Sequence, residues 1–311
     1  MKKVVIAAPE VHPLLYDGLT AMGFMPLRCD EKDKGSLYGN LYDAIGLVYT
    51  TYTRVDIPLL DTAPCLQFVA RVGSGMENTD IAACTSRNIA IFNSPEGLAP
   101  SVGEHALALI LSLLHHIVYS NLELKSGLWH RESNRGSELG GKCVGIMGMG
   151  NTGRALAKVL QGFDVRILYC DIIDITPPYP NTYQVTEEAI QTYADIISIH
   201  LPLNVHTYHY INEQWLSRCE RKPLLINTSR GSVVDTKALI TSLQNNSLKG
   251  LGIDVYEDEP PVLAVGERKE MYDILFSMPN VIATPHIAGW SVESKVNMAQ
   301  IILEKISKFY E

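Results

Sequence analysis

The chain has 311 residues, more than one compact core usually fills, so we expect two domains. Its composition, 46% hydrophobic and 19% charged, is ordinary for a soluble globular protein. The net charge of −8 argues against binding to nucleic acid or to an anionic membrane, and a small anionic substrate must be held by local cations because the overall field repels it.

Six cysteines are scattered through the chain without a Cys-x-x-Cys pair. In a chain of this size we expect reduced core thiols, with neither a disulfide framework nor a zinc site. The apolar run after Lys2 and Lys3 is too short for a signal peptide. The apolar stretch 106–114 ends at His115 and His116 and is too short to span a bilayer. We therefore expect a cytoplasmic protein without a metal site or a membrane partner.

Short β-forming runs alternate with helical periodicity from end to end, which predicts parallel sheets covered on both faces. The strands predicted in the first part lie at residues 3–7, 45–50, 66–70 and 90–92, with helices around 14–22 and 79–85. The strands predicted in the second part lie at residues 143–147, 164–169, 196–200, 224–227, 250–255 and 281–283.

Between the two parts, residues 102–125 form a long helical stretch that opens apolar and ends polar. We interpret it as a helix that crosses between the domains. A polar, glycine-rich stretch over residues 130–141 follows it, and no internal repeat is visible.

A glycine fingerprint, Gly-x-Gly-x-x-Gly, directly follows the apolar run 143–147 and precedes helix-forming sequence. Gly148 permits a tight turn, Gly150 lets a pyrophosphate approach the backbone, and Gly153 lets helix and strand pack closely. Taken alone, the pattern is just as well explained by a tight strand–helix turn.

The residues after the next strand favour a nucleotide site. Asp171 lies eighteen residues past Gly153, where a carboxylate accepts ribose hydroxyls and repels a 2′-phosphate. Ile172 and Ile173 follow, without an Arg or Lys for that phosphate, so the sequence favours NAD over NADP. The alternative for Asp171 is a solvated turn residue.

The first part of the chain has no such fingerprint, because the residues after strand 3–7 lack glycine. The turn Gly73-Ser74-Gly75 also lacks a third glycine at the right spacing. We interpret it as a loop that presents backbone N–H groups to a small anion, with a plain turn as the alternative.

Three candidate catalytic residues stand at or just after the ends of predicted strands, where side chains from separate loops of a parallel sheet converge. The Arg230 guanidinium suits bidentate binding of a carboxylate and polarisation of a carbonyl. The His286 imidazole suits proton transfer to a C2 oxygen near neutral pH. The Glu259 carboxylate, against His286, would stabilise the protonated ring. Each residue alone has a structural or surface explanation.

Seven blocks, in one order over nearly the whole chain, resemble the D-isomer-specific 2-hydroxyacid dehydrogenase family, and more closely its phosphoglycerate dehydrogenase-like branch. They are residues 71–80, 103–106, 148–153, 200–203, 227–231, 254–260 and 284–289.

The resemblance implies two doubly wound α/β parallel-sheet domains, with a Rossmann NAD-binding domain (residues 98–287) inserted in a flavodoxin-like substrate domain (residues 1–97 and 288–311). It implies a homodimer through an arm over about residues 100–139. The implied reaction moves a hydride between NAD and C2 of a small anionic D-2-hydroxy or 2-oxo acid, D-3-phosphoglycerate included.

The resemblance also implies roles for individual residues. The catalytic residues would be Arg230 for carboxylate and carbonyl, His286 for the proton and Glu259 for tuning His286, with Ser74 and Gly75 adding backbone donors to the substrate carboxylate. The implied cofactor contacts are Asn151 and Thr152 at the pyrophosphate, Asp171 at the adenosine ribose, Asp254 near the nicotinamide carboxamide, and Gly148, Gly150, Gly153, His200, Leu201, Pro202, Thr228, Ser229 and Ala288 elsewhere.

Two positions depart from the phosphoglycerate branch. Thr50 stands where that branch carries a phosphate-binding arginine, although Arg54 lies one turn on. Leu98 stands where a polar Asn is usual, and the chain stops at Glu311 without the extra regulatory domain of some members. A phosphorylated substrate is therefore in doubt.

Two other function classes stay open. A methyltransferase also uses a glycine-rich turn and an acidic residue after the second strand, but it has no need of the Arg230, Glu259 and His286 set. A non-catalytic NAD(H)-sensing protein of the same fold would keep all of these residues, although this chain lacks the long tails such proteins use for partners.

Overall fold

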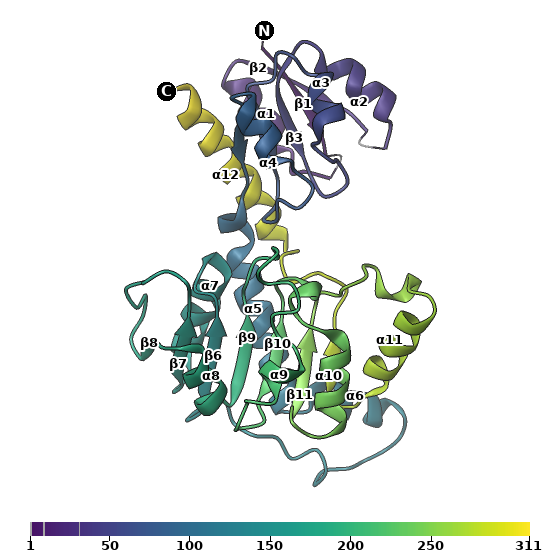
Figure 1. Ribbon diagram of the computed structural model, residues 1–311, viewed down its shortest axis with the longest axis vertical. Coiled ribbons are helices and arrows are strands. Elements are labelled where there is room, and N and C mark those ends of the chain that lie inside the picture. The colour runs from purple at the N-terminus through teal and green to yellow at the C-terminus, as the bar shows by residue number, and fades with distance from the viewer. Residues whose placement is uncertain (1, 9, 31) are drawn as a thin grey trace. The chain divides into compact units, whose positions relative to one another are not determined.

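The computed structural model describes residues 2–8, 10–30 and 32–311. Contacts divide the chain into two compact units (Figure 1). Unit 1 comprises Met1–Ala99 and Trp290–Glu311, and unit 2 comprises Pro100–Gly289. The boundaries expected from the sequence lie two residues earlier at both places.

Unit 1 contains a parallel sheet of five strands in the order β2-β1-β3-β4-β5. This is the flavodoxin-like order of a doubly wound sheet, so the predicted fold class is confirmed here. The strands are β1 (Lys2–Ala7), β2 (Phe24–Arg28), β3 (Ala44–Tyr49), β4 (Phe68–Arg71) and β5 (Ala90–Phe92).

Helices cover both faces of this sheet. The helices α2 (Lys34–Leu41), α3 (Ile57–Asp61) and α4 (Ile81–Ser86) bury one face, whereas α1 (Leu14–Ala21) and α12 (Val292–Tyr310) bury the other. Figure 1 shows the C-terminal α12, in yellow, beside α1. Ser291 begins α12 with a capping box, in which its hydroxyl accepts from the Ser294 N–H at 3.0 Å. The two ends of the chain therefore share one core.

Unit 2 contains a parallel sheet of seven strands in the order β12-β11-β10-β9-β6-β7-β8. Counted from β6 as the first strand, the order is that of a Rossmann sheet with β12 added at one edge, as predicted. The strands are β6 (Cys143–Met147), β7 (Arg166–Cys170), β8 (Thr182–Gln184), β9 (Ile196–Ile199), β10 (Leu224–Asn227), β11 (Gly250–Ile253) and β12 (Val281–Ala283).

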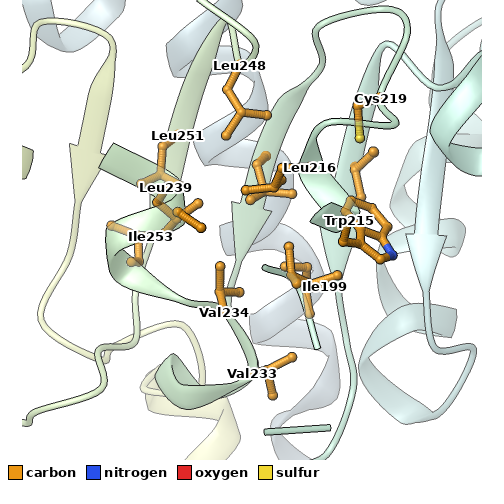
Figure 2. Close-up of a cluster of buried hydrophobic side chains, with 14 of the residues drawn as sticks. Ile199, Trp215, Leu216, Cys219, Val233, Val234, Leu239, Leu248, Leu251 and Ile253 are labelled. Atoms are coloured by element: carbon orange, nitrogen blue, oxygen red, sulfur yellow. The ribbon is translucent and has the colours of Figure 1, made fainter. Parts of the chain in front are cut away.

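The helices of unit 2 are also divided between two faces. On one face lie α8 (Glu187–Tyr193), α9 (Glu213–Leu216), α10 (Thr236–Gln244) and α11 (Glu267–Ser277), and on the other lie α5 (Pro95–Leu114) and α7 (Asn151–Val159). Short 3₁₀ turns occur at Leu160–Gly162, Gly231–Val233 and Pro261–Leu263. Figure 2 shows Trp215 and Leu216 of α9 and Leu239 of α10 in the first of these cores, over strand residues such as Ile199 and Leu251. This core fixes the ends of the strands.

The sequence prediction missed β2 and β8, the edge strands that flank β1 and β7. Pro26 lies within β2, and proline is tolerated only where no ladder hydrogen bond is needed, so it masks the strand in the sequence. The β8 strand, Thr-Tyr-Gln, is as short as β5 and β12 but lacks their apolar run, so nothing in the sequence marks it.

The single helix expected over residues 102–125 is wrong. The structure has two helices, α5 and α6 (Ile117–Lys125), and α5 begins seven residues earlier than expected, with Pro100 inside it. His116 adopts a left-handed backbone with φ of 52°, which ends the first helical path. None of the residues of α6 is buried.

At its full length, α5 is long and apolar enough to cross a membrane by length and composition, which the shorter stretch considered in the sequence was not. Half of that window is buried, and Leu109, Ile110 and Leu113 pack on the sheet. Helices in protein cores meet the same criterion.

The cysteines follow the expectation only in part. Four are buried and Cys170 is partly buried, but Cys65 is exposed. All six are free thiols.

Candidate active site

The three glycines of the turn after β6 have different structural roles. Gly148 has a φ of +94°, a left-handed conformation that favours glycine. A Cβ on Gly153 would lie 2.1 Å from the Gly148 carbonyl oxygen, so the close approach of α7 to the strand requires glycine there. A Cβ on Gly150 would meet nothing within 4 Å, which leaves open space beside the backbone. That space suits a bulky ligand group at the start of α7.

His200, directly after β9, links that strand to the first turn of α7, which follows β6. The strand order of the sheet reverses between β6 and β9. Its Nδ1 lies 3.0 Å from the Thr152 hydroxyl and its Nε2 lies 2.9 Å from the Ser198 hydroxyl. Burial lowers the pKa of His200 to about 4, so the ring is neutral near pH 7. His200 and Thr152 thus hold the two sides of the crevice in which open α/β sheets bind their ligands.

Asp171 lies directly after β7, beside the glycine turn. Its Oδ2 accepts the Met149 N–H at 2.7 Å, and its Oδ1 accepts the Ile173 N–H at 3.1 Å. These bonds fix the carboxylate in place and leave lone pairs for further donors. Ile172 and Ile173 are exposed.

The loop after β10 is organised by Asn227, which the sequence reasoning did not assign. Its Oδ1 accepts from the Ser229 N–H at 3.1 Å and hydroxyl at 2.9 Å, and its Nδ2 donates to the Arg230 carbonyl at 3.0 Å. The available signal was a polar residue ending a buried apolar strand. The Thr228 hydroxyl is buried and has no hydrogen-bond partner among the residues that the structure describes. A buried hydroxyl of this kind suits a polar ligand.

The loops after β11 and β12 bring Glu259 and His286 together, with Oε2 of Glu259 at 2.6 Å from Nδ1 of His286. The other oxygen of Glu259 accepts the Tyr256 N–H at 3.0 Å. Burial raises the pKa of Glu259, but the hydrogen bonds from His286 and Tyr256 and the charges of His286 and Arg230 lower it below its ordinary value. The neighbouring strands β10, β11 and β12 therefore present a guanidinium, a carboxylate and an imidazole at their carboxyl ends.

His286 has an unusual backbone, with a φ of 55° in the left-handed region. Non-glycine residues are uncommon there, and they cluster at sites where the surroundings fix them. The His286 side chain is 47% exposed, so a substrate can reach the ring.

Asp254 is completely buried behind this turn. Its Oδ1 accepts the Ile287 N–H at 2.9 Å and its Oδ2 accepts the Ala288 N–H at 2.8 Å. Ala288 is buried too. The role of Asp254 at the nicotinamide stays a prediction.

The remaining cofactor positions lie on exposed or partly buried parts of the same loops. Asn151 begins α7 and is exposed, and Leu201 is partly buried against the core. Pro202 is exposed, and its carbonyl accepts the Thr207 hydroxyl at 2.6 Å. Their contacts with a cofactor stay predictions.

In unit 1, the turn after β4 is held by side chains outside it. The Ser74 carbonyl accepts from Asn93 at 2.9 Å, and the Gly75 carbonyl accepts from Arg71. Among the described residues, the N–H groups of Ser74 and Gly75 have no hydrogen-bond partner. This leaves two backbone donors available, which the predicted binding of a carboxylate requires.

The loop after β3 is held by Asn78, a second residue that the sequence reasoning missed. Its Nδ2 lies 3.0 Å from the Thr50 carbonyl, 3.2 Å from that of Thr51 and 2.7 Å from that of Thr53. The side chain of Arg54 is 81% exposed on this loop and lies 3.7 Å from Asp56.

Comparison with known protein families shows the family to which a chain with this arrangement belongs. The profile described as "D-isomer specific 2-hydroxyacid dehydrogenase, NAD binding domain" matches residues 107–288, more than half of the chain. The chain belongs to the D-isomer-specific 2-hydroxyacid dehydrogenase family.

Relatives of this dehydrogenase include two enzyme types. A glyoxylate reductase of Thermofilum pendens is 35% identical, over 85% of this chain and 78% of that protein. A D-3-phosphoglycerate dehydrogenase of Bacillus subtilis is 31% identical, over 95% of this chain and 56% of its own length. The crystal structure of an NADPH-dependent glyoxylate/hydroxypyruvate reductase of Sinorhizobium meliloti gives a TM-score of 0.83 at 29% identity, covering 100% of this chain and 95% of that one.

These findings establish the class of enzyme. The chain is an NAD(P)-dependent D-2-hydroxyacid dehydrogenase that acts on a small 2-hydroxy or 2-oxo acid. Its residues fit a bound dinucleotide, because the space beside Gly150 is open and the buried Thr228 hydroxyl lacks a partner among the described residues.

Proposed function

We propose that this dehydrogenase uses NAD(H) in preference to NADP(H) and interconverts a small, unphosphorylated D-2-hydroxy acid and its 2-oxo acid. The contact of 2.6 Å between Glu259 and His286, with the charge of Arg230 acting on the same carboxylate, carries the proposal. The bound nicotinamide supplies or accepts the hydride at C2 of the substrate.

The residues of the chain transfer the proton to or from the C2 oxygen and bind the charged carboxylate of the substrate. Glu259 engages Nδ1 of His286, so Nε2 is the nitrogen that can donate a proton to the C2 oxygen during reduction and remove it during oxidation. The Arg230 guanidinium has the fork geometry that binds the substrate carboxylate and stabilises charge on the neighbouring oxygen. The backbone donors of Ser74 and Gly75 are proposed to bind the same carboxylate.

The cofactor preference depends on the end of β7. The Asp171 carboxylate is fixed by the Met149 N–H, so a 2′-phosphate brought to this position would meet a negative charge that cannot turn away. Ile172 and Ile173, both exposed, bring no compensating cation. We propose the glycine turn, Asn151, Thr152, the loop 200–202, Thr228, Ser229, Asp254 and Ala288 as the other cofactor contacts.

The substrate proposal depends on what the chain lacks and on its relatives. Thr50 and Leu98 replace polar residues of the phosphoglycerate branch. Reductases of glyoxylate and hydroxypyruvate are similar to this chain over most of their own length. A small 2-oxo acid such as glyoxylate or hydroxypyruvate fits this combination, and phosphorylated substrates are expected to react more slowly.

The apolar side chains of α6 support a further part of the proposal, assembly as a homodimer through the arm at residues 100–139. Ile117 (52% exposed), Leu122 (56%) and Leu124 (58%) lie along this helix, and none of its residues is buried in the monomer. Exposed apolar surface of this kind marks protein interfaces. Light scattering on the purified protein tests this. The negative net charge and free thiols support a cytoplasmic enzyme without nucleic-acid or membrane partners.

The decisive experiment follows NADH oxidation with glyoxylate, hydroxypyruvate, pyruvate, branched 2-oxo acids and 3-phosphohydroxypyruvate. We expect turnover with at least one unphosphorylated acid and a loss of about a hundredfold to ten-thousandfold in His286→Asn. Tight NADH binding without turnover on the whole panel would favour a sensor. An unchanged rate in His286→Asn would remove His286 from its role.

A further inference from the structure

A chain of polar side chains, of which Asp254 is buried and His105 and Thr284 are partly buried, lies behind the His286 turn, outside the catalytic trio. His105, on α5, lies with Nε2 at 3.0 Å from the Thr284 hydroxyl. The same hydroxyl lies 2.5 Å from Oδ1 of Asp254, and His105 itself lies 3.7 Å from that oxygen. All of these residues belong to unit 2.

The available donors and acceptors determine the direction of the hydrogen bonds between these side chains. A carboxylate can only accept, and Asp254 already accepts the N–H groups of Ile287 and Ala288. The single hydroxyl proton of Thr284 is therefore donated to Asp254. The hydroxyl must then accept from His105, whose Nε2 carries the proton. The chain runs in one sense, from His105 through Thr284 to Asp254.

Every anchor of this chain falls on a residue next to His286 or two positions away from it. Thr284 stands two residues before His286, and Ile287 and Ala288 stand one and two residues after it. Two further hydrogen bonds hold the same turn, from the Tyr256 hydroxyl to the Thr284 carbonyl at 2.8 Å and from the Ser101 hydroxyl to the Ala288 carbonyl at 2.7 Å. The turn is thus held on both sides of His286, whose backbone is left-handed.

The hydrogen bonds around the turn explain how the His286 ring keeps its direction. The His286 ring is half-exposed, and among the described residues its hydrogen bond is to Glu259, so its direction depends largely on its backbone. A left-handed backbone at a non-glycine residue relaxes unless its surroundings hold it. Asp254 holds the following N–H groups, and Thr284 and His105 hold Asp254 in the orientation that does so.

We propose that His105 and Thr284 are positioning residues for His286, and that they act by fixing Asp254 against the turn that carries the imidazole. The proposal rests on the function proposed for His286. It predicts that breaking the chain lowers kcat while leaving NADH binding and folding largely intact.

The first test removes the Thr284 hydroxyl. Thr284→Val keeps the shape of the side chain but can neither donate to Asp254 nor accept from His105, and Thr284→Ser keeps the hydroxyl. We expect kcat to fall about tenfold or more in the valine variant, as a misplaced catalytic group allows, and to recover to within about threefold in the serine variant. Thr182→Val is the control, because Thr182 is more buried than Thr284 and its hydroxyl donates to the Pro180 carbonyl at 3.1 Å, away from the His286 turn.

The second test uses His105. His105→Gln keeps an N–H donor near the position of Nε2, whereas His105→Leu removes it. We expect the glutamine variant to retain most of the activity and the leucine variant to resemble Thr284→Val. The dissociation constant for NADH, from quenching of protein fluorescence, should change much less than kcat in all four variants, because the proposed cofactor contacts at the glycine turn, Asp171 and residues 200–202 do not depend on Asp254.

Two measurements separate positioning from general damage. In a His286→Asn background, Thr284→Val should lower the residual rate by less than about twofold, since it acts only through the imidazole. Hydrogen exchange of the peptide over residues 284–289 should be faster in Thr284→Val and normal in Thr284→Ser.

The outcomes are distinguishable. Equal losses from Thr284→Val with and without the imidazole, or unchanged exchange of the turn, would overturn the positioning role. If His286→Asn itself kept full activity, the proposed function would fail instead, and the exchange measurement would still report whether the chain anchors the turn.

Discussion

Oε2 of Glu259 and Nδ1 of His286 are 2.6 Å apart, although the two residues are 27 positions apart in the chain. The short contact joins a carboxylate whose pKa is lowered to an imidazole that faces solvent. The lowered pKa keeps Glu259 ionised near neutral pH, so its negative charge acts on the imidazole ring there.

Replacing that charge should lower the rate of 2-oxo acid reduction. Glu259→Gln keeps an oxygen that accepts from Nδ1 but removes the negative charge beside the ring. We expect kcat to fall about tenfold or more, because a preorganised charge next to the proton-transferring group is lost. Initial rates near neutral pH check it. Glu267→Gln, at the exposed start of α11, is the control, and an unchanged rate in Glu259→Gln would contradict the electrostatic role.

Arg230 should not tolerate lysine. Its loop is fixed by Asn227, and its Nη1 donates to the Ser229 carbonyl at 2.7 Å, which orients the guanidinium fork. A lysine ammonium is a point charge and cannot bind a carboxylate through two parallel bonds. We expect Arg230→Lys to lower kcat/KM about a hundredfold or more, as loss of a preorganised donor does. Arg221→Lys is the control. Arg221 precedes the N-terminal end of β10, whereas Arg230 follows its C-terminal end, so this variant should leave kcat/KM unchanged.

The cofactor preference should follow the charge at the end of β7. In Asp171→Ser with Ile172→Arg, a hydroxyl and a guanidinium replace the carboxylate and an exposed isoleucine. We expect the ratio of kcat/KM for NADH over NADPH to fall about a hundredfold, since a like charge against the phosphate costs several kcal/mol. Asp174→Ser in the same loop should leave the ratio nearly unchanged. If that control moved the ratio as far, Asp171 would not be the selecting residue.

The sequence predicted the strands of both sheet centres because fully buried strands are continuous apolar runs. The runs at β5, β6, β10 and β12 match the structure at both ends. The glycine turn and the catalytic residues were found because they stand next to these runs, at the edge where parallel strands end. The strands that were missed are β2, where Pro26 interrupts the pattern, and β8, which is no apolar run. The edge strands β5 and β12 were found because they are apolar runs, and the break at His116 depends on one left-handed residue.

The residues that organise the site were harder to find than those expected to react. Asn227, Asn78 and His105 act through hydrogen bonds to loops, and the bonds of Asn78 and His105 join positions 25 or more residues apart. No local pattern marks such a residue, because the same side chain in a solvated loop would be read identically. The resemblance implies a cofactor contact at His200, but its bonds to Thr152 and Ser198 are visible only in three dimensions.

Burial of His200 predicts a loss of stability in mild acid. Its pKa is lowered from 6.5 to about 4 in the folded protein, so the unfolded chain takes up a proton over this interval and the folded one does not. The contribution to the free energy of unfolding is therefore complete above about pH 6.5 and is lost as the pH falls towards about 4. By about pH 5 the loss is about 2 kcal/mol.

Urea unfolding at several pH values tests this in the cofactor-free protein. His200→Gln lacks the titrating ring, so its free energy of unfolding should fall less between about pH 7 and about pH 5 than that of the unaltered chain. His206→Gln, exposed on the loop that follows β9, should keep the full slope. An equal slope in all three proteins would assign the acid sensitivity to other groups.

Two glycines of one turn should respond to alanine in opposite ways. A Cβ at Gly153 would lie 2.1 Å from the Gly148 carbonyl oxygen, a rigid backbone atom, so helix α7 must move away from the strand. A Cβ at Gly150 meets nothing within 4 Å, and its backbone conformation, with φ of −73°, suits any residue. We expect Gly153→Ala to lose about 1–3 kcal/mol of stability or more, as overpacking does, and Gly150→Ala to unfold normally.

Binding should separate the same pair. The methyl group of Gly150→Ala would occupy the open space at the start of α7, where a pyrophosphate approaches the backbone, so NADH affinity should fall about tenfold or more despite an intact fold. Thermal unfolding and NADH titration on both variants check this. Normal NADH binding by Gly150→Ala would place the pyrophosphate elsewhere, whereas a stable Gly153→Ala would show that α7 can shift without cost. Only a turn in which one glycine makes room for the ligand and the other for the helix gives both results.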